Sequence, residues 1–295
     1  MAGVPEKDAI DAGTERQSRQ SGIVPLRAAP ITIDKTLRPA PITIDKTLRC
    51  RHELKYRISE SKAAAVEKFI QPYIHPDRFC KIQPTGWYPI VSLYLDSPDL
   101  KLCKESLTGK KNRYKLRIRG YSDDPAYPKF FEIKRRINTV ILKDRQRVNP
   151  RDIAGLLSGG ALPPQYYSTE QEALKQFNLY QRSINAGPLV LVRYLRRAYE
   201  DDSETRVRIT FDRELTYRMT DKPEVALGSS GWQQVPMNFV ILEIKFTSRF
   251  PAWLSRMVRC VELMQSSFSK YANCVLSARE ISLSNPRINE YNRPG

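Results

Sequence analysis

Five segments of this chain place charged and apolar residues at alternate positions. The clearest is YKLRIRGY, in which Lys115, Arg117 and Arg119 alternate with Leu116 and Ile118. Successive side chains of a β-strand point to opposite faces of its sheet, so the pattern predicts a strand with one charged face and one apolar face. The same pattern occurs in RHELKYRI, FFEIKRR, TRVRITFD and VILEIKF.

The charged strand faces favour a closed sheet. They carry short basic or E-x-K patterns, whereas an ordinary solvated face mixes charged residues with Thr, Ser, Gln and Tyr. Closing an antiparallel sheet would gather these faces in a wet lumen. We therefore predict an α+β fold, with a closed antiparallel β-barrel tunnel of about eight strands and helices packed outside. The alternative is a one-sided sheet whose charged face is solvated.

The charge balance indicates a polyanionic partner. The chain has 49 Lys and Arg against 32 Asp and Glu, a formal net charge of +17, and a pI near 9.7. A basic lumen would concentrate positive potential along its length, which suits a linear phosphate chain. Nucleic acid is the general alternative for a basic protein. We expect no nucleic-acid partner, because glutamates alternate with the basic residues and most strand aromatics fall on the apolar face.

Basic strand residues are the candidate phosphate ligands, because arginine binds phosphate oxygens in bidentate geometry and lysine neutralises them as a point charge. Glutamates among phosphates are tolerable where a divalent cation bridges the two, so Glu243, Glu132 and Glu53 are candidate metal ligands. The chain has two histidines and five scattered cysteines with no CxxC pair. We therefore expect Mg²⁺ or Mn²⁺. The candidate substrate-binding residues on or beside these strands are Arg57, Lys115, Arg136, Lys143, Arg145, Arg197 and Arg208.

Residues 1–49 resemble a disordered arm, being rich in Ala, Pro, Gly and Ser with little hydrophobic periodicity. Within this arm APITIDKTLR occurs twice in tandem, which is too few copies for a solenoid; a short docking strand is the alternative. We expect a folded domain at 50–282 and a polar C-terminal tail at 283–295. No signal-peptide core and no apolar run of about 20 residues is present, so we expect a cytoplasmic protein without a membrane span.

Two helices are expected outside the sheet. Ser59 is a plausible N-cap for a helix through SESKAAAVEKFIQPYI. The segment 251–277 begins with Pro251, which is favoured at helix N-termini, and predicts one long helix. Its apolar face would include Met257, Val261 and Met264.

Eight short motifs in the chain resemble, in the same order, those of a known family. They are RHELKY, SLYLD, the R-x-R of Arg117 and Arg119, FEIKRR, VRYLRRAY, RVRITFD, LEIKF and FSKY, spread over residues 50–275. The sequence therefore resembles the VTC domain, the catalytic module of the vacuolar transporter chaperone complex, within the triphosphate tunnel metalloenzymes. The resemblance implies a tunnel of antiparallel strands and a polymerase that extends polyphosphate with the terminal phosphate of ATP.

Site residues carry over from the family by motif position. The resemblance implies that Glu243 of LEIK is the ligand of Mn²⁺ or a similar metal. It also implies that Tyr194 and Ser269 are weaker substrate-binding candidates. The catalytic, phosphate-binding positions that it implies are Lys55, Arg117, Arg119, Lys134, Arg193, Arg206, Lys245 and Lys270.

The first motif departs from the superfamily pattern. Triphosphatases begin with E-x-E-x-K, whereas Arg51–Lys55 reads RHELK. The arginine removes one metal carboxylate and adds positive charge, which favours holding a phosphate chain over activating a water. We therefore expect a metal-dependent polyphosphate polymerase that uses ATP or another nucleoside triphosphate. The alternatives are a triphosphatase acting on tripolyphosphate or nucleotides, and a non-catalytic polyphosphate-binding module. The oligomeric state stays open.

Overall fold

The computed structural model describes the central part of the chain. The described ranges are 52–138, 140–160, 172–201, 207–247 and 249–284. The expected N-terminal arm and residues 285–295 of the expected tail lie outside them, so those boundaries stay predictions. Residues 283 and 284 belong to the last helix.

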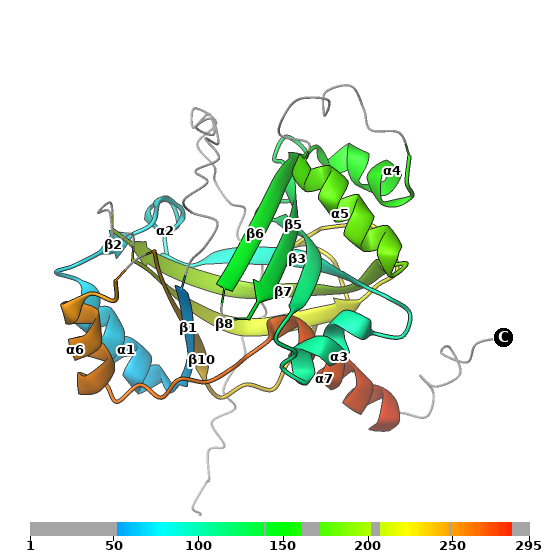
Figure 1. Ribbon diagram of the computed structural model, residues 1–295. Helices are drawn as coiled ribbons and strands as arrows, with labels where there is room; N and C mark the ends of the chain where they lie inside the picture. The colour runs from blue at the N-terminus through cyan, green and yellow to red at the C-terminus, as the bar shows by residue number, and fades with distance from the viewer. Residues whose placement is uncertain (1–51, 139, 161–171, 202–206, 248, 285–295) are drawn as a thin grey trace, which may run out of the picture.

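Ten strands form one antiparallel sheet (Figure 1). Eight of them follow the order β1-β10-β8-β7-β3-β4-β5-β6, while β2 pairs with β7 and β9 with β8. The strands are β1 (His52–Ile58), β2 (His75–Pro76), β3 (Tyr88–Asp96), β4 (Arg113–Gly120), β5 (Lys129–Ile137), β6 (Val140–Val148), β7 (Gly187–Glu200), β8 (Arg208–Met219), β9 (Gln233–Gln234) and β10 (Val240–Phe246).

Helices surround the sheet (Figure 1). They are α1 (Glu60–Ile70), α2 (Arg78–Lys81), α3 (Lys101–Leu107), the 3₁₀ turn η2 (Pro150–Asp152), α4 (Ile153–Leu157), α5 (Glu172–Ser183), α6 (Ala252–Cys260) and α7 (Lys270–Ser284). The expected N-cap of α1 is confirmed, because Ser59 Oγ accepts a hydrogen bond from the backbone N–H of Lys62 at 3.2 Å. None of the helices in the described ranges has the length and apolarity that crossing a membrane requires.

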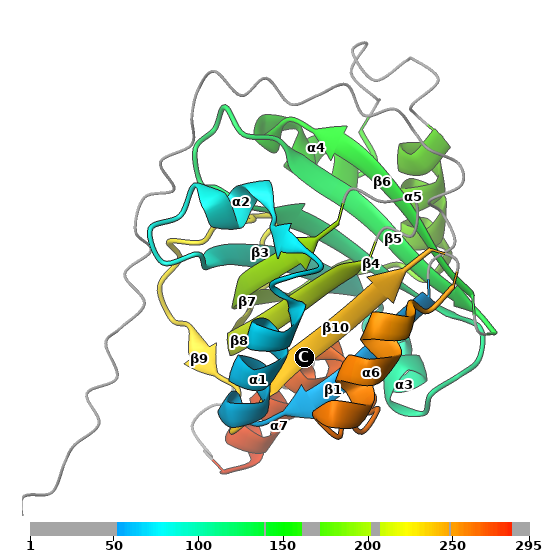
Figure 2. The same ribbon diagram turned by 90° about the vertical axis from the view of Figure 1, so that its left-hand side faces the viewer.

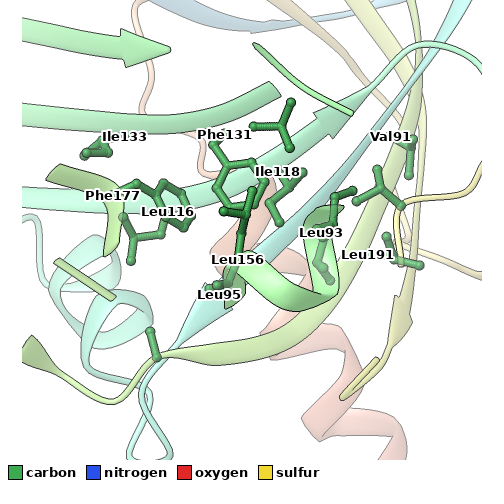
Figure 3. Packing of buried hydrophobic residues seen from close by; sticks show 14 of the residues in the cluster. Val91, Leu93, Leu95, Leu116, Ile118, Phe131, Ile133, Leu156, Phe177 and Leu191 are labelled. Carbon is green, nitrogen blue, oxygen red and sulfur yellow. The ribbon is translucent and has the colours of Figure 1, made fainter. Parts of the chain in front are cut away.

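Most apolar strand residues face outward and form two packed layers with helices, while a third apolar cluster packs α7 against β3, β7 and β8. Figure 3 shows Leu116, Ile118 and Phe131 of the sheet against Leu156 of α4 and Phe177 of α5. On the other half of the sheet, α1 and α6 cover β1, β10 and β8 (Figure 2). This burial of apolar area fixes which face of every strand is outward, because a slip of one residue would reverse all side chains.

Most of the charged residues of the alternating strands share the opposite, inner face. Arg117 of β4 lies directly across from Glu132 of β5, and Lys55 of β1 lies directly across from Glu243 of β10. Cross-strand neighbours of opposite charge stabilise a sheet where their side chains meet. The alternation in the sequence therefore gathers the charged residues of β1, β4, β5 and β10 on one face.

The sheet is a curled half-barrel, and the closed barrel expected from the sequence is not shown. β1 and β6 are the two ends of the strand order, with no ladder between them in the described ranges. The free edge of β1 is partly covered by another segment: Tyr56 and Gln265 form an isolated antiparallel bridge, and the Ser266 N–H donates to the Lys55 carbonyl oxygen at 2.8 Å. A side-chain ion pair, rather than a backbone ladder, links the two sides of the gap.

The expectation of one long helix over 251–277 is wrong. The segment forms α6 and α7, separated by residues 261–269. Glu262 has a φ of +52°, and the Leu263 N–H reaches back to the Val258 carbonyl oxygen at 2.9 Å. A residue in this left-handed conformation ends an α-helix. The break leaves Met264 84% exposed, where an apolar helix face was expected.

Candidate functional site

A pocket of about 80 Å³ lies on the inner face of the sheet, against the N-terminal end of α7. Seven different structural elements supply its walls, so it exists only once the sheet has curled. Its lining residues are Lys55, Tyr94, Lys115, Arg117, Arg119, Lys134, Tyr194, Arg196, Glu243, Lys245, Ser269, Lys270 and Tyr271. Ten of these were expected from the sequence to contact substrate or metal.

Glu132 anchors one group of cations on the inner face. This carboxylate is 0% exposed. Its oxygens lie 2.7 Å from Arg117 Nη2, 2.7 Å from Lys143 Nζ, 3.4 Å from Arg145 Nε and 3.8 Å from Arg119 Nε. Burial acts to raise the pKa of Glu132, but the four cations outweigh it and hold the pKa well below its usual range. Glu132 is therefore an ionised counter-ion at the centre of four positive groups.

Glu243 anchors a second group of the same kind. Its carboxylate oxygens lie 3.2 Å from Lys55 Nζ, 2.9 Å from Lys245 Nζ, 3.2 Å from Lys270 Nζ and 3.8 Å from Arg196 Nη2. Burial raises the pKa of this carboxyl, and the surrounding cations lower it far more. The candidate metal ligand of the LEIK motif is thus held by four cations from four different elements.

Arg196 and Asp212 were not expected from the sequence to belong to the site. Arg196 donates from Nε and Nη2 to the two oxygens of Asp212, both at 2.7 Å. Asp212 also lies 2.6 Å from Lys270 Nζ and is 0% exposed. Asp212 lies inside β8 and pairs with Arg196 across the ladder.

Glu53 occupies the gap between the two sides of the sheet. Lys134 Nζ of β5 lies 3.0 and 2.9 Å from the two oxygens of Glu53, and Lys55 Nζ lies 3.2 Å from one of them. The opposing charges of Lys134 and Lys55 outweigh the effect of burial and lower the pKa of Glu53. Glu53 and Lys134 also line an adjoining cavity that contains Arg136.

Crowding of cations changes the pKa of several lysines. Burial, only partly offset by Glu53, lowers the pKa of Lys134 to about 8. Burial, partly offset by Glu132, likewise lowers the pKa of Lys143 to about 8. Lys115, whose Nζ donates to Ser269 Oγ at 2.7 Å, has a pKa well below its usual range because of burial and then of Lys55 and Lys134. A bound polyanion would restore the charge of such groups.

Four expected substrate ligands lie away from the pocket. Arg193 is on the outer face, where Nη1 donates to the Leu227 carbonyl oxygen at 2.9 Å. Arg197 is also outside, with Nη1 3.3 Å from Glu67. Both share odd-numbered positions of β7, whereas Tyr194 and Arg196 share the even-numbered, inner positions, so one strand could not present all of them to one site.

The other two displaced arginines are at strand ends. Arg57 lies over the Phe239 ring, with 5.6 Å from its guanidinium carbon to the ring centroid. Arg208 pairs with Asp77 at 2.6 Å and with Glu200. Arg206 lies outside the described residues. Lys143 and Arg145 do not line the pocket. They pair with Glu132, which also pairs with the pocket residues Arg117 and Arg119.

The pocket residues that the sequence did not indicate are Tyr94, Arg196 and Tyr271, and Asp212 pairs with Arg196 and Lys270 behind them. Tyr271 donates a hydrogen bond to Asp96 and stacks on Tyr94, with ring centroids 4.9 Å apart. Period-two alternation from Tyr194 could have identified Arg196. Nothing local in the sequence distinguishes Tyr94, because β3 carries no Lys, Arg or Glu to mark its inner face.

The carboxylates fit a divalent cation only together with a phosphate ligand. Within the described ranges no group of three or more His, Cys, Asp or Glu side chains could hold a metal by itself. Glu53 and Glu243 both contact Lys55 Nζ at 3.2 Å and are the two carboxylates best placed to share an ion. Mg²⁺ is commonly bound by one or two carboxylates plus substrate phosphates, so this donor set is sufficient if phosphate oxygens complete it.

The fold and the pocket define the class: an α+β protein with a curled antiparallel sheet whose inner face holds buried carboxylates among lysines and arginines. The chain belongs to the VTC domain family, because the family model of the VTC domain matches residues 50–279. No curated protein matches the chain.

Two solved structures show a partial likeness to this chain at low identity. HpAC1 from Hippeastrum, a candidate adenylyl cyclase described as having a dominant triphosphatase activity, is 15% identical with a TM-score of 0.46, covering 77% of this chain and 96% of its own. A candidate adenylate cyclase from Bacillus halodurans is 14% identical with a TM-score of 0.42, covering 74% and 93%.

Proposed function

We propose that this protein is a metal-dependent polyphosphate polymerase, which transfers the terminal phosphate of ATP or another nucleoside triphosphate onto a growing polyphosphate chain. The observation that carries the proposal is the pair of carboxylate-centred cation groups around Glu132 and Glu243, on one inner face. Membership of the VTC domain family supports it further. We expect the protein, and therefore the reaction, to be in the cytoplasm.

The two cation groups would position the phosphates and neutralise their charge. Such transfers need positioning and neutralisation of charge more than covalent chemistry. Arg117 and Arg119 would bind phosphate oxygens bidentately, while Lys55, Lys245 and Lys270 would neutralise the chain as point charges. In the free protein the carboxylates hold these side chains in place, so their ordering precedes substrate binding.

A divalent cation, Mn²⁺ or Mg²⁺, would be held by Glu243 with Glu53 and by phosphate oxygens. When bound, it would neutralise charge on the transferring phosphoryl group. The Glu53 carboxylate already forms ion pairs with Lys55 and Lys134. The neighbouring His52 ring stacks on Phe246, with ring centroids 5.0 Å apart. Pairing of Glu53 with both lysines keeps this carboxylate itself from acting as a base toward a water, which favours transfer over hydrolysis.

The test is incubation of the purified protein with ATP and Mn²⁺, followed by ³¹P NMR and by gel staining for polyphosphate. We expect internal-phosphate signals and ADP, both lost in Glu243→Gln. The matched control is Glu67→Gln, which removes an outer-face carboxylate that pairs with Arg197 and should leave synthesis intact. Release of free phosphate alone would assign a triphosphatase, and binding of polyphosphate without turnover would assign a binding module.

A further inference from the structure

The helices α1 and α6 form an outer layer that contributes nothing to the lining of the pocket. They lie side by side over β1, β10 and β8 (Figure 2). The two helices run antiparallel. Near the start of α1, Lys62 Nζ donates to the carbonyl oxygen of Glu262, just past the end of α6, at 2.8 Å. Past the end of α1, the Tyr73 ring stacks on Trp253 at the start of α6.

Each helix directs its apolar side toward the sheet. α1 buries Val66 and Ile70, and α6 buries Leu254 and Met257. The side that faces away from the sheet is basic, and we call it the helical face. Its cations are the exposed side chains of Lys68, Arg249, Arg256 and Arg259, together with the half-buried Lys62.

The cations of the helical face lack counter-ions of their own. The two glutamates of α1 are paired with arginines of the sheet, Glu60 with Arg213 at 2.6 Å and Glu67 with Arg197 at 3.3 Å. Helix α6 contains no acidic residue. Within the part of the chain that the structure describes, no carboxylate forms an ion pair with a cation of the helical face. Exposed cations that the protein leaves unpaired favour an anionic partner.

Three stacked aromatic rings border the helical face. Tyr73 stacks on Trp253 with ring centroids 4.6 Å apart and on Phe69 with centroids 5.9 Å apart, yet Tyr73 is 40% exposed. Proteins that bind single-stranded nucleic acid offer free ring faces to the bases, whereas the faces of Tyr73 are engaged by its neighbours and its edge is exposed. Tyr and Trp beside basic residues are typical of surfaces at the membrane–water interface.

We propose that the helical face binds the anionic surface of a lipid bilayer. Its basic side chains contact the headgroups, and the edges of Tyr73 and Trp253 enter the headgroup layer. Each Lys or Arg near such a surface strengthens binding roughly fivefold, so attachment of this kind requires no spanning segment. α1 and α6 lie on the outer side of the sheet, so the pocket on the inner side stays accessible in the attached protein. The proposal goes beyond the proposed function and does not depend on it.

Sedimentation of the full chain with lipid vesicles tests the proposal. Vesicles of phosphatidylcholine alone are compared with vesicles of equal parts phosphatidylcholine and phosphatidylserine. Arg256→Glu combined with Arg259→Glu reverses two charges of the helical face. The matched control is Arg151→Glu combined with Lys175→Glu, which changes the net charge equally at two exposed positions, on η2 and α5.

We expect the unmodified protein to bind the phosphatidylserine vesicles and to leave the neutral ones. The helical-face variant should bind at least about twentyfold more weakly, and the control variant within about threefold of the unmodified protein. All four substitutions are at exposed positions, and circular dichroism checks that both variants fold. Equal losses in the two variants would show a response to net charge alone and would overturn the proposal. Failure of the unmodified protein to bind phosphatidylserine vesicles would also overturn it.

Tryptophan fluorescence locates the contact independently. Emission should shift to shorter wavelength when phosphatidylserine vesicles are added, because the edge of Trp253 leaves water. Trp253→Phe, which keeps a ring beside Tyr73, should abolish the shift and still sediment with the vesicles. Sedimentation without a shift that depends on Trp253 would place the membrane contact elsewhere and overturn the proposal. Binding of a single-stranded oligonucleotide by the helical face, without binding of vesicles, would assign nucleic acid as the partner instead.

Discussion

Lys134 and Glu53 are joined across the open side of the sheet, with the lysine Nζ 3.0 and 2.9 Å from the two carboxylate oxygens. β5 carries one residue and β1 the other, and these strands lie near opposite ends of the strand order. Only the curl of the sheet can bring them together. The pair therefore reports directly on whether the half-barrel keeps its curled shape in solution.

A double-mutant cycle measures that contact. We expect Glu53→Gln, Lys134→Met and the double variant to show a coupling free energy of about 0.5–3 kcal/mol in urea unfolding, the range for residues in contact. Coupling near the lower end is expected because Lys134 is 29% exposed and screened by solvent. Additive effects of the two substitutions would mean that the sheet opens in solution.

The two faces of the sheet predict opposite behaviour for two arginines. Arg119→Gln removes an inner-face guanidinium and should weaken tripolyphosphate binding by about tenfold or more, since hydrogen bonds to charged groups contribute about 1.5–3 kcal/mol. Arg193→Gln removes an outer-face guanidinium and should leave the Kd within about twofold. Calorimetry of both variants checks this. Equal weakening by the two substitutions would contradict the assignment of faces.

Binding should weaken as the pH rises through 8. The pKa values of Lys134 and Lys143 are about 8 in the free protein, and a bound phosphate chain raises them by stabilising the charged form. Both lysines are charged below pH 8, so the favourable interaction is complete there and is lost above it. We expect the tripolyphosphate Kd to rise by up to about tenfold for each lysine between pH 7 and 9.

The control for this pH dependence is the double variant Lys134→Met, Lys143→Met. It should bind more weakly at pH 7 and show little further loss at pH 9. Tripolyphosphate also titrates near this range, but that contribution is common to both proteins. A pH profile unchanged by the substitutions would assign the dependence to the ligand.

Glu243 is predicted to act differently on stability and on binding. Glu243→Gln leaves Lys55, Lys245, Lys270 and Arg196 without their shared counter-ion, which should destabilise the fold by about 3–5 kcal/mol, as for other broken buried ion pairs. In EDTA the same variant should bind tripolyphosphate at least as tightly as the unmodified protein, because only the cations act there. Thermal unfolding and calorimetry give the two values.

Measurement in EDTA separates the two roles of the Glu243 carboxylate, which are arranging the cations and holding the metal. A Glu243→Gln variant that loses tripolyphosphate affinity even without metal would show that the carboxylate mainly arranges the cations. Retained binding together with lost ATP turnover in Mn²⁺ is the result that the proposed metal role requires.

The sequence by itself determined the faces of most strands. Period-two alternation assigned Lys55, Arg117 and Arg119 to the charged face and Leu116 and Ile118 to the apolar one, and the structure places them there. That prediction succeeds because the two faces of a strand follow from backbone geometry alone. The Ser59 cap of α1 is equally local, since an N-cap is satisfied within three residues.

Tertiary structure decided which charged residues meet. Arg193 and Tyr194 are adjacent in one motif, yet only Tyr194 reaches the pocket, because packing of the outer layer fixes the orientation of β7. Asp212 became a partner of Arg196 through the pairing of β8 with β7. The break between α6 and α7 placed Ser269 and Lys270 against the sheet. These outcomes depend on contacts between residues far apart in sequence, and the free energy of those contacts is invisible to any local pattern.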